Sequence, residues 1–363
     1  MRLPLSALPA ALALACGGQA THSPGARVHV YEDPRLTVVT PSVREEIEVD
    51  RSRAFADYAV DLVSGATQAL TVDAVSAATR FEEARQQLSV GVAHPLTERT
   101  EARATYGVSL EGDHLAQAPS FGLAREVGDG MAKVSGRYQV VVERIGRADD
   151  PSYEASALGH RIDLAWSAIA TRELTWAALA TASGHTCDER PGCFANPYRW
   201  VGVHGTPGGI LAVPETHPGR RLTLAGALRL AWAPTPTSAL GGGYRWAGDD
   251  WGLVAHTVDA SGALESPGLG WLLRADARAT LQGAADFQRE RYVADATSLP
   301  RYRTADAELA ALWTVRVQVH LGWRLGWARP ALQLGRMWSR YDSFAGPAAR
   351  DAWLAGAGLD GTL

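Results

Sequence analysis

The sequence predicts an all-β chain that closes into a transmembrane antiparallel β-barrel of about fourteen strands, within a range of roughly twelve to sixteen. Three observations predict this fold. Long segments alternate between apolar and polar side chains, tryptophan recurs on the apolar face, and short connections alternate with long ones. A period of two places successive side chains on opposite faces of a strand, as a wall between lipid and water requires.

The clearest alternation runs over residues 305–327. A strand in a soluble sheet is usually only about 5–6 residues long. Here one parity carries apolar residues and the other carries polar ones, namely Leu309, Ala311, Trp313, Val315, Val317, Val319, Leu321, Trp323, Leu325 and Trp327 against Glu308, Thr314, Arg316, Gln318, His320 and Arg324.

Composition is consistent with a membrane protein and argues against a nucleic-acid partner. The chain has 363 residues and a net charge of −4, with a pI near 6.2, so no basic surface is expected. It contains twelve Trp and ten Tyr but only six Phe and three Met. Trp and Tyr favour the boundary between lipid and water.

The amino terminus is predicted to be a signal peptide over residues 1–15. Arg2 supplies the positive start, an uncharged and mostly apolar stretch follows, and Ala13-Leu14-Ala15 forms a cleavage site. The apolar stretch is shorter than the roughly 20 residues that a membrane-spanning helix needs. We therefore expect export, and an outer-membrane location in a Gram-negative type of envelope.

Cys16 follows the cleavage site and is a candidate lipidation site, so the protein is also a candidate lipoprotein. Ordinary signal-peptidase cleavage before Cys16 is the alternative, and the residues leave both open. Residues 16–50 are predicted to be an N-terminal linker with a candidate short strand at 38–49. The barrel is then expected to occupy residues 51–363.

Within the barrel, strands are predicted near 54–62, 239–247, 252–258, 269–282, 305–327, 331–341 and 353–363, with others between 84 and 232. Their polar faces carry many charges, which a dry core would not tolerate. Connections at 94–99, 128–130, 170–173 and 234–238 are short, whereas 63–80, 145–157 and 184–219 are long. Transmembrane barrels have short periplasmic turns and longer outer loops. The connection at 248–251 is short where a long one is expected.

The longest irregular segment, 184–219, contains Cys187 and Cys193 together with His185, His204 and His217. A disulfide between the two cysteines is predicted, because exported thiols meet an oxidising compartment. A Cys/His metal site is the alternative, but no zinc-site spacing such as paired C-x₂-C units is present. We expect neither a metal nor a cofactor.

No catalytic motif stands out, and we expect a protein that is not an enzyme. The chain has no G-x-S-x-G elbow and no H-E-x-x-H helix. Asp113-His114 lies at a predicted outer loop, where a solvated loop tip is the simpler interpretation.

The expected function is that of a porin-like channel or surface-binding barrel for a small polar solute of unknown identity. Outer-membrane lipid and the barrel-assembly machinery are the expected partners. The rival is a secreted β-sandwich or adhesin-like protein that binds through the Cys187–Cys193 loop. The side chains predicted to line the lumen, where charge reversal is expected to change ion selectivity, are Arg274, Asp276, Arg278, Arg316, Gln318 and His320.

One stretch resembles the domain-of-unknown-function 3570 family of bacterial outer-membrane proteins. The resemblance rests on the runs DLVSGAT at 61–67 and DAVSAATR at 73–80, then Glu83 and Arg85, VYED at 30–33, SLEGD at 109–113 and Ser343-Phe344. It would cover roughly residues 27–363, and it implies an outer-membrane β-barrel without an assigned activity. Outer-membrane barrels usually end on an aromatic residue, whereas this chain ends Asp360-Gly361-Thr362-Leu363.

Overall fold

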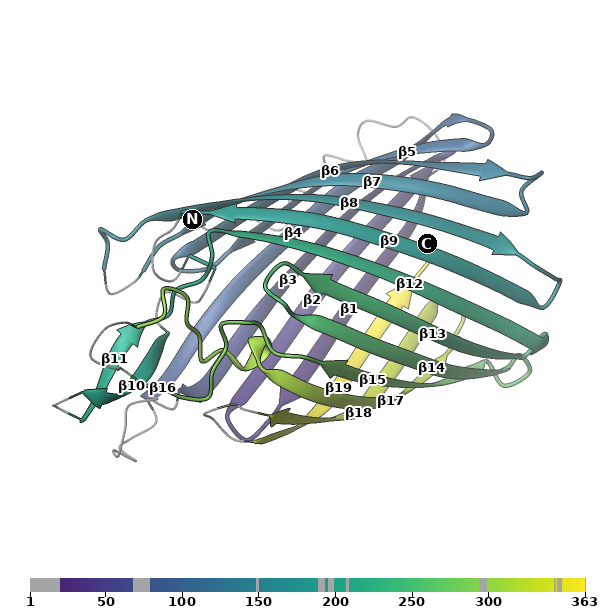
Figure 1. Ribbon diagram of the computed structural model, residues 1–363. Helices are drawn as coiled ribbons and strands as arrows, with labels where there is room; N and C mark the ends of the chain where they lie inside the picture. The colour runs from purple at the N-terminus through teal and green to yellow at the C-terminus, as the bar shows by residue number, and fades with distance from the viewer. Residues whose placement is uncertain are drawn as a thin grey trace.

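In the computed structural model, the chain is a closed antiparallel β-barrel of sixteen strands, with a small three-stranded sheet beyond one end (Figure 1). The structure describes residues 20–67, 79–147, 150–188, 193–194, 199–206, 209–293, 299–342, 344 and 348–362. The predicted signal peptide and Cys16 lie outside the described residues, and both stay predictions. Among the described residues, no helix is long and apolar enough to cross a membrane.

Each barrel strand pairs with its neighbours along the chain, and the ring closes between the first strand and the last. The barrel strands are β1 (Ala20–Glu32), β2 (Leu36–Val49), β3 (Ser52–Thr67), β4 (Thr79–Thr97), β5 (Thr100–Leu110), β6 (His114–Val127), β7 (Ala132–Ile145), β8 (Ala155–Ile169), β9 (Leu174–Cys187), β12 (Arg220–Thr235), β13 (Ser238–Asp249), β14 (Val254–Ser266), β15 (Trp271–Gln282), β17 (Ala311–Trp323), β18 (Ala328–Asp342) and β19 (Ala349–Gly361).

The closing pair β1–β19 is antiparallel and runs from Gly25 opposite Asp360 to Glu32 opposite Trp353. Arg27 strengthens it, because its Nη2 lies 3.0 Å from both carboxylate oxygens of Asp360. Closure leaves no strand edge with unpaired N–H and C=O groups, which lipid could not satisfy. The secreted β-sandwich is therefore the wrong alternative.

The candidate strand at 38–49 is confirmed as β2, whereas the linker predicted before it is wrong from Ala20 onwards, because this segment forms β1. The two strands belong to the barrel and bring the count from about fourteen to sixteen. Prolines obscured β1 and weakened the prediction of β2. Pro24 and Pro41 donate no hydrogen bond, yet both are accommodated in the β1–β2 pair. The charged run at 44–46 is also tolerated, since Arg44 pairs with Glu46 at 2.8 Å and with Asp57 on β3 at 3.2 Å.

The long alternation at 305–327 contains a shorter strand than predicted, because β17 spans only Ala311–Trp323. Before it, the Asp306 side chain accepts a hydrogen bond from the Glu308 amide and caps the 3-10 helix η1 (Ala307–Leu309). After it, Gly326 turns the chain with a φ of 62°. Local capping and a positive-φ glycine thus override the side-chain period at both ends.

The predicted difference between the two barrel ends is confirmed. One end carries only short turns, such as 50–51, 98–99 and 236–237, and both terminal strands begin or finish there. The other end carries the long segments 188–219 and 283–310, although the β13–β14 connection at 250–253 is short, as the sequence indicated. By the general rule for these barrels, the short turns face the periplasm.

The outward face of the barrel is apolar and framed by aromatic residues at both ends. Trp166 and Trp232 lie near the short-turn ends of β8 and β12, whereas Trp246 and Trp353 lie near the long-loop ends of β13 and β19, all at least 38% exposed. Large apolar side chains left bare on this scale require a lipid environment. The protein is an outer-membrane β-barrel in contact with membrane lipid.

Charged residues also occur on the outward face near the outer aromatic belt. Arg336 stacks over the Trp353 ring, with its guanidinium carbon 4.5 Å from the ring centroid. Asp351 accepts a hydrogen bond of 2.6 Å from Arg340 and lies 3.9 Å from Arg336. These contacts balance the charge at the level where aromatic rings meet lipid headgroups.

A matched pair of substitutions tests which face meets lipid. Val319→Trp on β17 places a ring among lipid tails and should leave stability unchanged within about 0.5 kcal/mol. Gly335→Trp on β18 should destabilise the barrel by about 1–3 kcal/mol, because a Cβ there would lie 2.6 Å from Gln318 Cγ and 2.8 Å from the Val317 carbonyl oxygen.

The measurement is the temperature at which the compact band of an unboiled sample converts to the slower, unfolded band on a denaturing gel. Equal losses of stability in the two variants would contradict the assignment of faces.

Candidate solute passage

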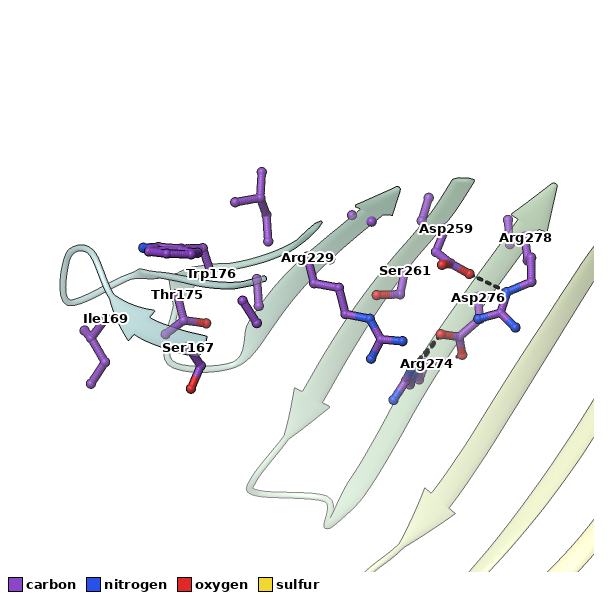
Figure 2. Close-up of a pocket in the computed structure, with 18 of the residues that line it drawn as sticks. Ser167, Ile169, Thr175, Trp176, Arg229, Asp259, Ser261, Arg274, Asp276 and Arg278 are labelled. Carbon is purple, nitrogen blue, oxygen red and sulfur yellow. Dashed lines mark hydrogen bonds and ion pairs between the residues drawn. The ribbon is translucent and has the colours of Figure 1, made fainter. Parts of the chain in front are cut away.

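Two neighbouring strands bring the six predicted lumen residues together. On β15 and β17 the residues face each other in register, with Arg274 opposite His320, Asp276 opposite Gln318 and Arg278 opposite Arg316. All six line one cavity of about 970 Å³ inside the barrel. Figure 2 shows Arg274, Asp276 and Arg278 along one strand, with Arg229 reaching towards them from another.

Two of the three acids that line this cavity, Asp259 and Asp276, are paired with neighbouring basic side chains, and the third is Glu126. Asp276 lies 2.6 Å from Nη2 of Arg274 and 3.4 Å from Nε2 of His320. Arg278 pairs across to Asp259 on β14. Water still reaches this cluster, since the Arg274 side chain remains 56% exposed.

A second cavity of about 850 Å³ adjoins the first, and Lys133 and Arg229 line both. It is lined further by Arg103, Arg137, Arg161 and Arg245, which the prediction of lumen residues omitted. The signal was present for most of them, since these basic residues occupy the polar parity of alternating segments. The register that unites them could not be read from one strand at a time.

Small inward residues give the basic side chains their room. On β13, Gly241 and Gly243 share the inward parity with Arg245, and a Cβ on Gly243 would lie 3.5 Å from Cγ of Arg229. Between them, Gly242 points to the other face, where a Cβ would meet no atom within 4 Å. A long arginine side chain therefore extends along the wall at a point where the neighbouring strand has no side chain.

The loop segment contains the predicted disulfide. Cys187, the last residue of β9, is bonded to Cys193, with the two Cα atoms 6.1 Å apart. Cys193 is 7% exposed. Neither Cys187 nor Cys193 is therefore a free thiol, and the disulfide holds the start of the long loop to the rim of the barrel.

Three carboxylates gather at the outer rim, from Glu83, Glu111 and Asp113, with oxygens within 4.8 Å of one another. Arg85 lies 3.8 Å from Glu111 and balances part of this charge. Sequence alternation did not predict this cluster, because Glu83 and residues 111–113 lie almost 30 residues apart and meet only through the register of the β4–β5 hairpin.

The outer end also carries a small cap that the sequence did not predict. It contains the sheet of β10 (Trp200–Thr206), β11 (Gly209–Pro214) and β16 (Tyr292–Val293), in the order β11-β10-β16. Val201, Val203 and Tyr292 form one apolar cluster there. The parallel pairing of β10 with β16 joins segments almost 90 residues apart, which explains why local patterns missed it.

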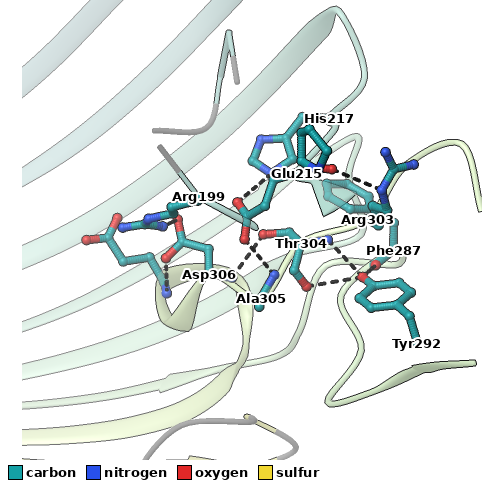
Figure 3. A network of polar contacts seen from close by, with 11 residues as sticks. Arg199, Glu215, His217, Phe287, Tyr292, Arg303, Thr304, Ala305 and Asp306 are labelled. Atoms are coloured by element: carbon teal, nitrogen blue, oxygen red, sulfur yellow. Dashed lines mark hydrogen bonds and ion pairs between the residues drawn. The ribbon is translucent and has the colours of Figure 1, made fainter. Parts of the chain in front are cut away.

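Beside the cap sheet lies a buried polar network (Figure 3). Glu215 is 1% exposed and accepts a hydrogen bond of 2.7 Å from the Ala305 amide. The hydroxyl of Tyr292 accepts one of 2.8 Å from the Thr304 amide and donates one of 2.6 Å to the Phe287 carbonyl. The Ala305–Glu215 bond joins residues 299–310 to the loop that precedes β12, and the Thr304–Tyr292 bond joins the same residues to β16.

His217 lies in the same network, with its Nε2 3.8 Å from Oε2 of Glu215. Among the described residues, neither ring nitrogen has a hydrogen-bond partner. The ring packs edge-on against Trp251, with the centroids 5.2 Å apart. Burial lowers the pKa of His217 to about 4 and raises the pKa of Glu215.

Comparisons with known proteins place the chain by family and by fold. A family model described as "Protein of unknown function (DUF3570)" matches residues 153–335, half of the chain. The motif at 61–80 lies outside this range. No curated protein matches the sequence.

Among solved structures, a bacterial polysaccharide outer membrane secretin has a TM-score of 0.52 at 7% identity, over 95% of this chain and 99% of that one. A loop-deletion variant of OmpT, an outer membrane protein of Vibrio cholerae, has a TM-score of 0.46 at 10% identity, over 95% and 99%. The siderophore receptor PirA from Pseudomonas aeruginosa has 0.49 at 10% identity; the alignment covers 94% of this chain but 62% of that one. These are likenesses of fold.

The cap should lose stability in acid through His217, and a Glu215→Gln background isolates the effect. The pKa of His217 is about 4 in the folded cap, against 6.5 for the ordinary group. The opened cap therefore binds a proton more readily than the folded cap below pH 6.5. As a result, the folded cap keeps its full stability above pH 6.5 and loses stability progressively towards pH 4. Glu215 acts in the opposite direction, because its raised pKa favours the folded form as the pH falls.

Hydrogen exchange of the Thr304 amide, corrected for intrinsic rates, measures cap opening. Between pH 7 and pH 5 it should accelerate about tenfold in Glu215→Gln, and much less after His217→Phe is added. The same acceleration in both proteins would contradict the role of His217.

Proposed function

The chain belongs to the family described as Protein of unknown function (DUF3570), and we propose that it forms a water-filled passage for a small polar solute through the outer membrane. The observation that carries the proposal is the pair of adjoining charged cavities inside a closed ring of sixteen strands. Barrels of about 16–18 strands are wide enough to leave an aqueous channel.

The state of the inward side chains supports an aqueous interior. Arg137 and Arg161 both bond Asp163, yet their side chains remain 45% and 44% exposed. A guanidinium group in a dry interior would be far more costly than one that keeps contact with water. The ion pairs join residues of one strand or of adjacent strands, so they fix the arginines along the wall without crossing the lumen.

The proposal includes no catalytic chemistry. In the larger cavity Asp276 lies between two polar groups, with Ser261 opposite it on β14 and His320 nearby on β17. A hydrolytic triad needs the imidazole between the hydroxyl and the carboxylate. This order places the carboxylate in the middle, which favours a binding or lining role.

Assembly would depend on the last strand. The barrel-assembly machinery is the proposed partner, and β19 is the segment that it would recognise, with Trp353 and Leu359 on the lipid face. This outward apolar row is the proposed recognition feature.

A second role, surface binding of a solute by the cap, is favoured by one feature. The cap buries the carboxylate of Glu215 and the imidazole of His217 without a hydrogen bond between them. Leaving buried polar atoms without hydrogen bonds costs stability. A solute that bonded these atoms would remove that cost.

Bilayer conductance of the folded, purified protein tests the passage. Discrete ohmic steps are expected. Gly243→Trp should roughly halve the step size because its ring would occupy the lumen beside Arg229. Gly242→Trp, one residue away on the lipid face, should leave it unchanged. Both variants are first checked for the compact band on an unboiled gel.

A folded wild-type barrel that conducts no ions would overturn the passage. Equal conductance in the two compact variants would place the conducting path elsewhere than beside β13.

A further inference from the structure

We infer that the passage selects for small anions bearing carboxylate or phosphate groups, and that a band of unpaired cations performs the selection. The inference rests on the proposed function and specifies its solute class. The band comprises four side chains that line the two cavities, namely Lys133 on β7, Arg229 on β12, Arg245 on β13 and Arg316 on β17.

The two cavities carry more basic than acidic side chains. Nine basic residues line them, against five acidic ones: Arg103, Lys133, Arg137, Arg161, Arg229, Arg245, Arg274, Arg278 and Arg316 against Glu101, Glu126, Asp163, Asp259 and Asp276. The whole chain has a net charge of −4, so the excess is a local feature of the lumen.

Four of the five acids already have cationic partners. Asp163 accepts from Arg137 and Arg161 at 2.7 and 2.8 Å. Asp276 and Asp259 pair with Arg274 and Arg278. Glu101 pairs at 2.8 Å with Arg53, which belongs to neither cavity lining. The fifth acid, Glu126, lies opposite Lys133 in the β6–β7 register, without an ion pair of 4.0 Å or less between the two. The unpaired negative charge of the two cavities is therefore one carboxylate, against several unpaired cations.

The four band residues are different, because within the described ranges none has an acidic group within 4.0 Å. Arg103 is held differently, with its guanidinium 5.2 Å from the Phe55 ring centroid. The band therefore keeps its hydrogen-bond donors for water or for a solute.

The four band residues come from different sides of the ring. Following the strand order, β7 and β17 are seven positions apart in a ring of sixteen, almost diametrically opposite. Arg229 and Arg245 lie on adjacent strands between them. An anion in the lumen would thus meet cations on opposing walls, within low-dielectric surroundings that focus the field.

The chemistry of the donors indicates the solute class. Three of the four are arginines, whose planar guanidinium groups bind carboxylate and phosphate through two parallel hydrogen bonds. Chloride would benefit only from the charge. We therefore expect small oxyanions to dwell in the lumen longer than chloride of the same charge.

Reversal potentials in a KCl gradient test the charge selectivity on the channel that the conductance experiment detects. The wild-type chloride-to-potassium permeability ratio should exceed one. It should fall at least about twofold in Arg229→Gln/Arg316→Gln, because two of four unpaired charges are lost. Arg125→Gln, a basic residue of β6 outside both cavities, should leave the ratio unchanged.

The oxyanion preference is tested by adding phosphate or acetate at fixed chloride. Either anion should reduce the chloride current, and the double variant should abolish the reduction. A conducting wild-type channel with a ratio at or below one would overturn the anion inference while leaving the passage intact. Absence of conductance from folded protein would instead overturn the proposed function. An anion-selective channel unaffected by phosphate and acetate would overturn the oxyanion class.

Discussion

The hydrogen-bonded seam between β1 and β19 is the constraint on which the rest of the structure depends. In lipid, each unpaired backbone group would cost several kcal/mol. An open sixteen-stranded sheet would expose two full edges. The register from Gly25–Asp360 to Glu32–Trp353 removes both. It also forces a single inward parity around the whole ring, because a strand that slipped by one residue would exchange its two faces.

Because the ring is closed with one inward parity, the outer face of the wall meets lipid and the inner face meets water. Outward side chains such as Val319 and Leu334 remain 44% and 58% exposed and face lipid, and aromatic residues mark both boundaries. Inward arginines reach acids on neighbouring strands, as Arg137 does with Asp163. Because the pairs run along the wall, the same interactions that stabilise the barrel leave its interior available to water and to a solute.

Side-chain period was sufficient to predict the barrel, its two faces and the asymmetry of its ends, because each of these follows from alternation within a strand. It failed where another interaction dominated. Prolines in β1 and β2 obscured a strand pair that the closing seam requires. The Asp306 cap and the buried Leu309 delay the start of the strand predicted at 305–327 until Ala311.

The lumen was predictable in part for a similar reason. The alternation of β15 and β17 identified six side chains that line one cavity. The grouping of Lys133 with Arg229 and Arg245 follows only from the strand order, which brings β7 and the β12–β13 hairpin around the same space. The cap network of Glu215 and His217 depends on pairings between remote loops, which no local pattern encodes.

The most direct measurement of the central claim is water accessibility along β17 in the folded protein embedded in lipid. Single cysteines at positions 316, 317, 318 and 319, in a background without the native cysteines, would be treated with a membrane-impermeant thiol reagent. Arg316→Cys and Gln318→Cys should be labelled rapidly, whereas Val317→Cys and Val319→Cys should be protected. Similar labelling at all four positions, or the opposite parity, would contradict a wall with lipid outside and water inside.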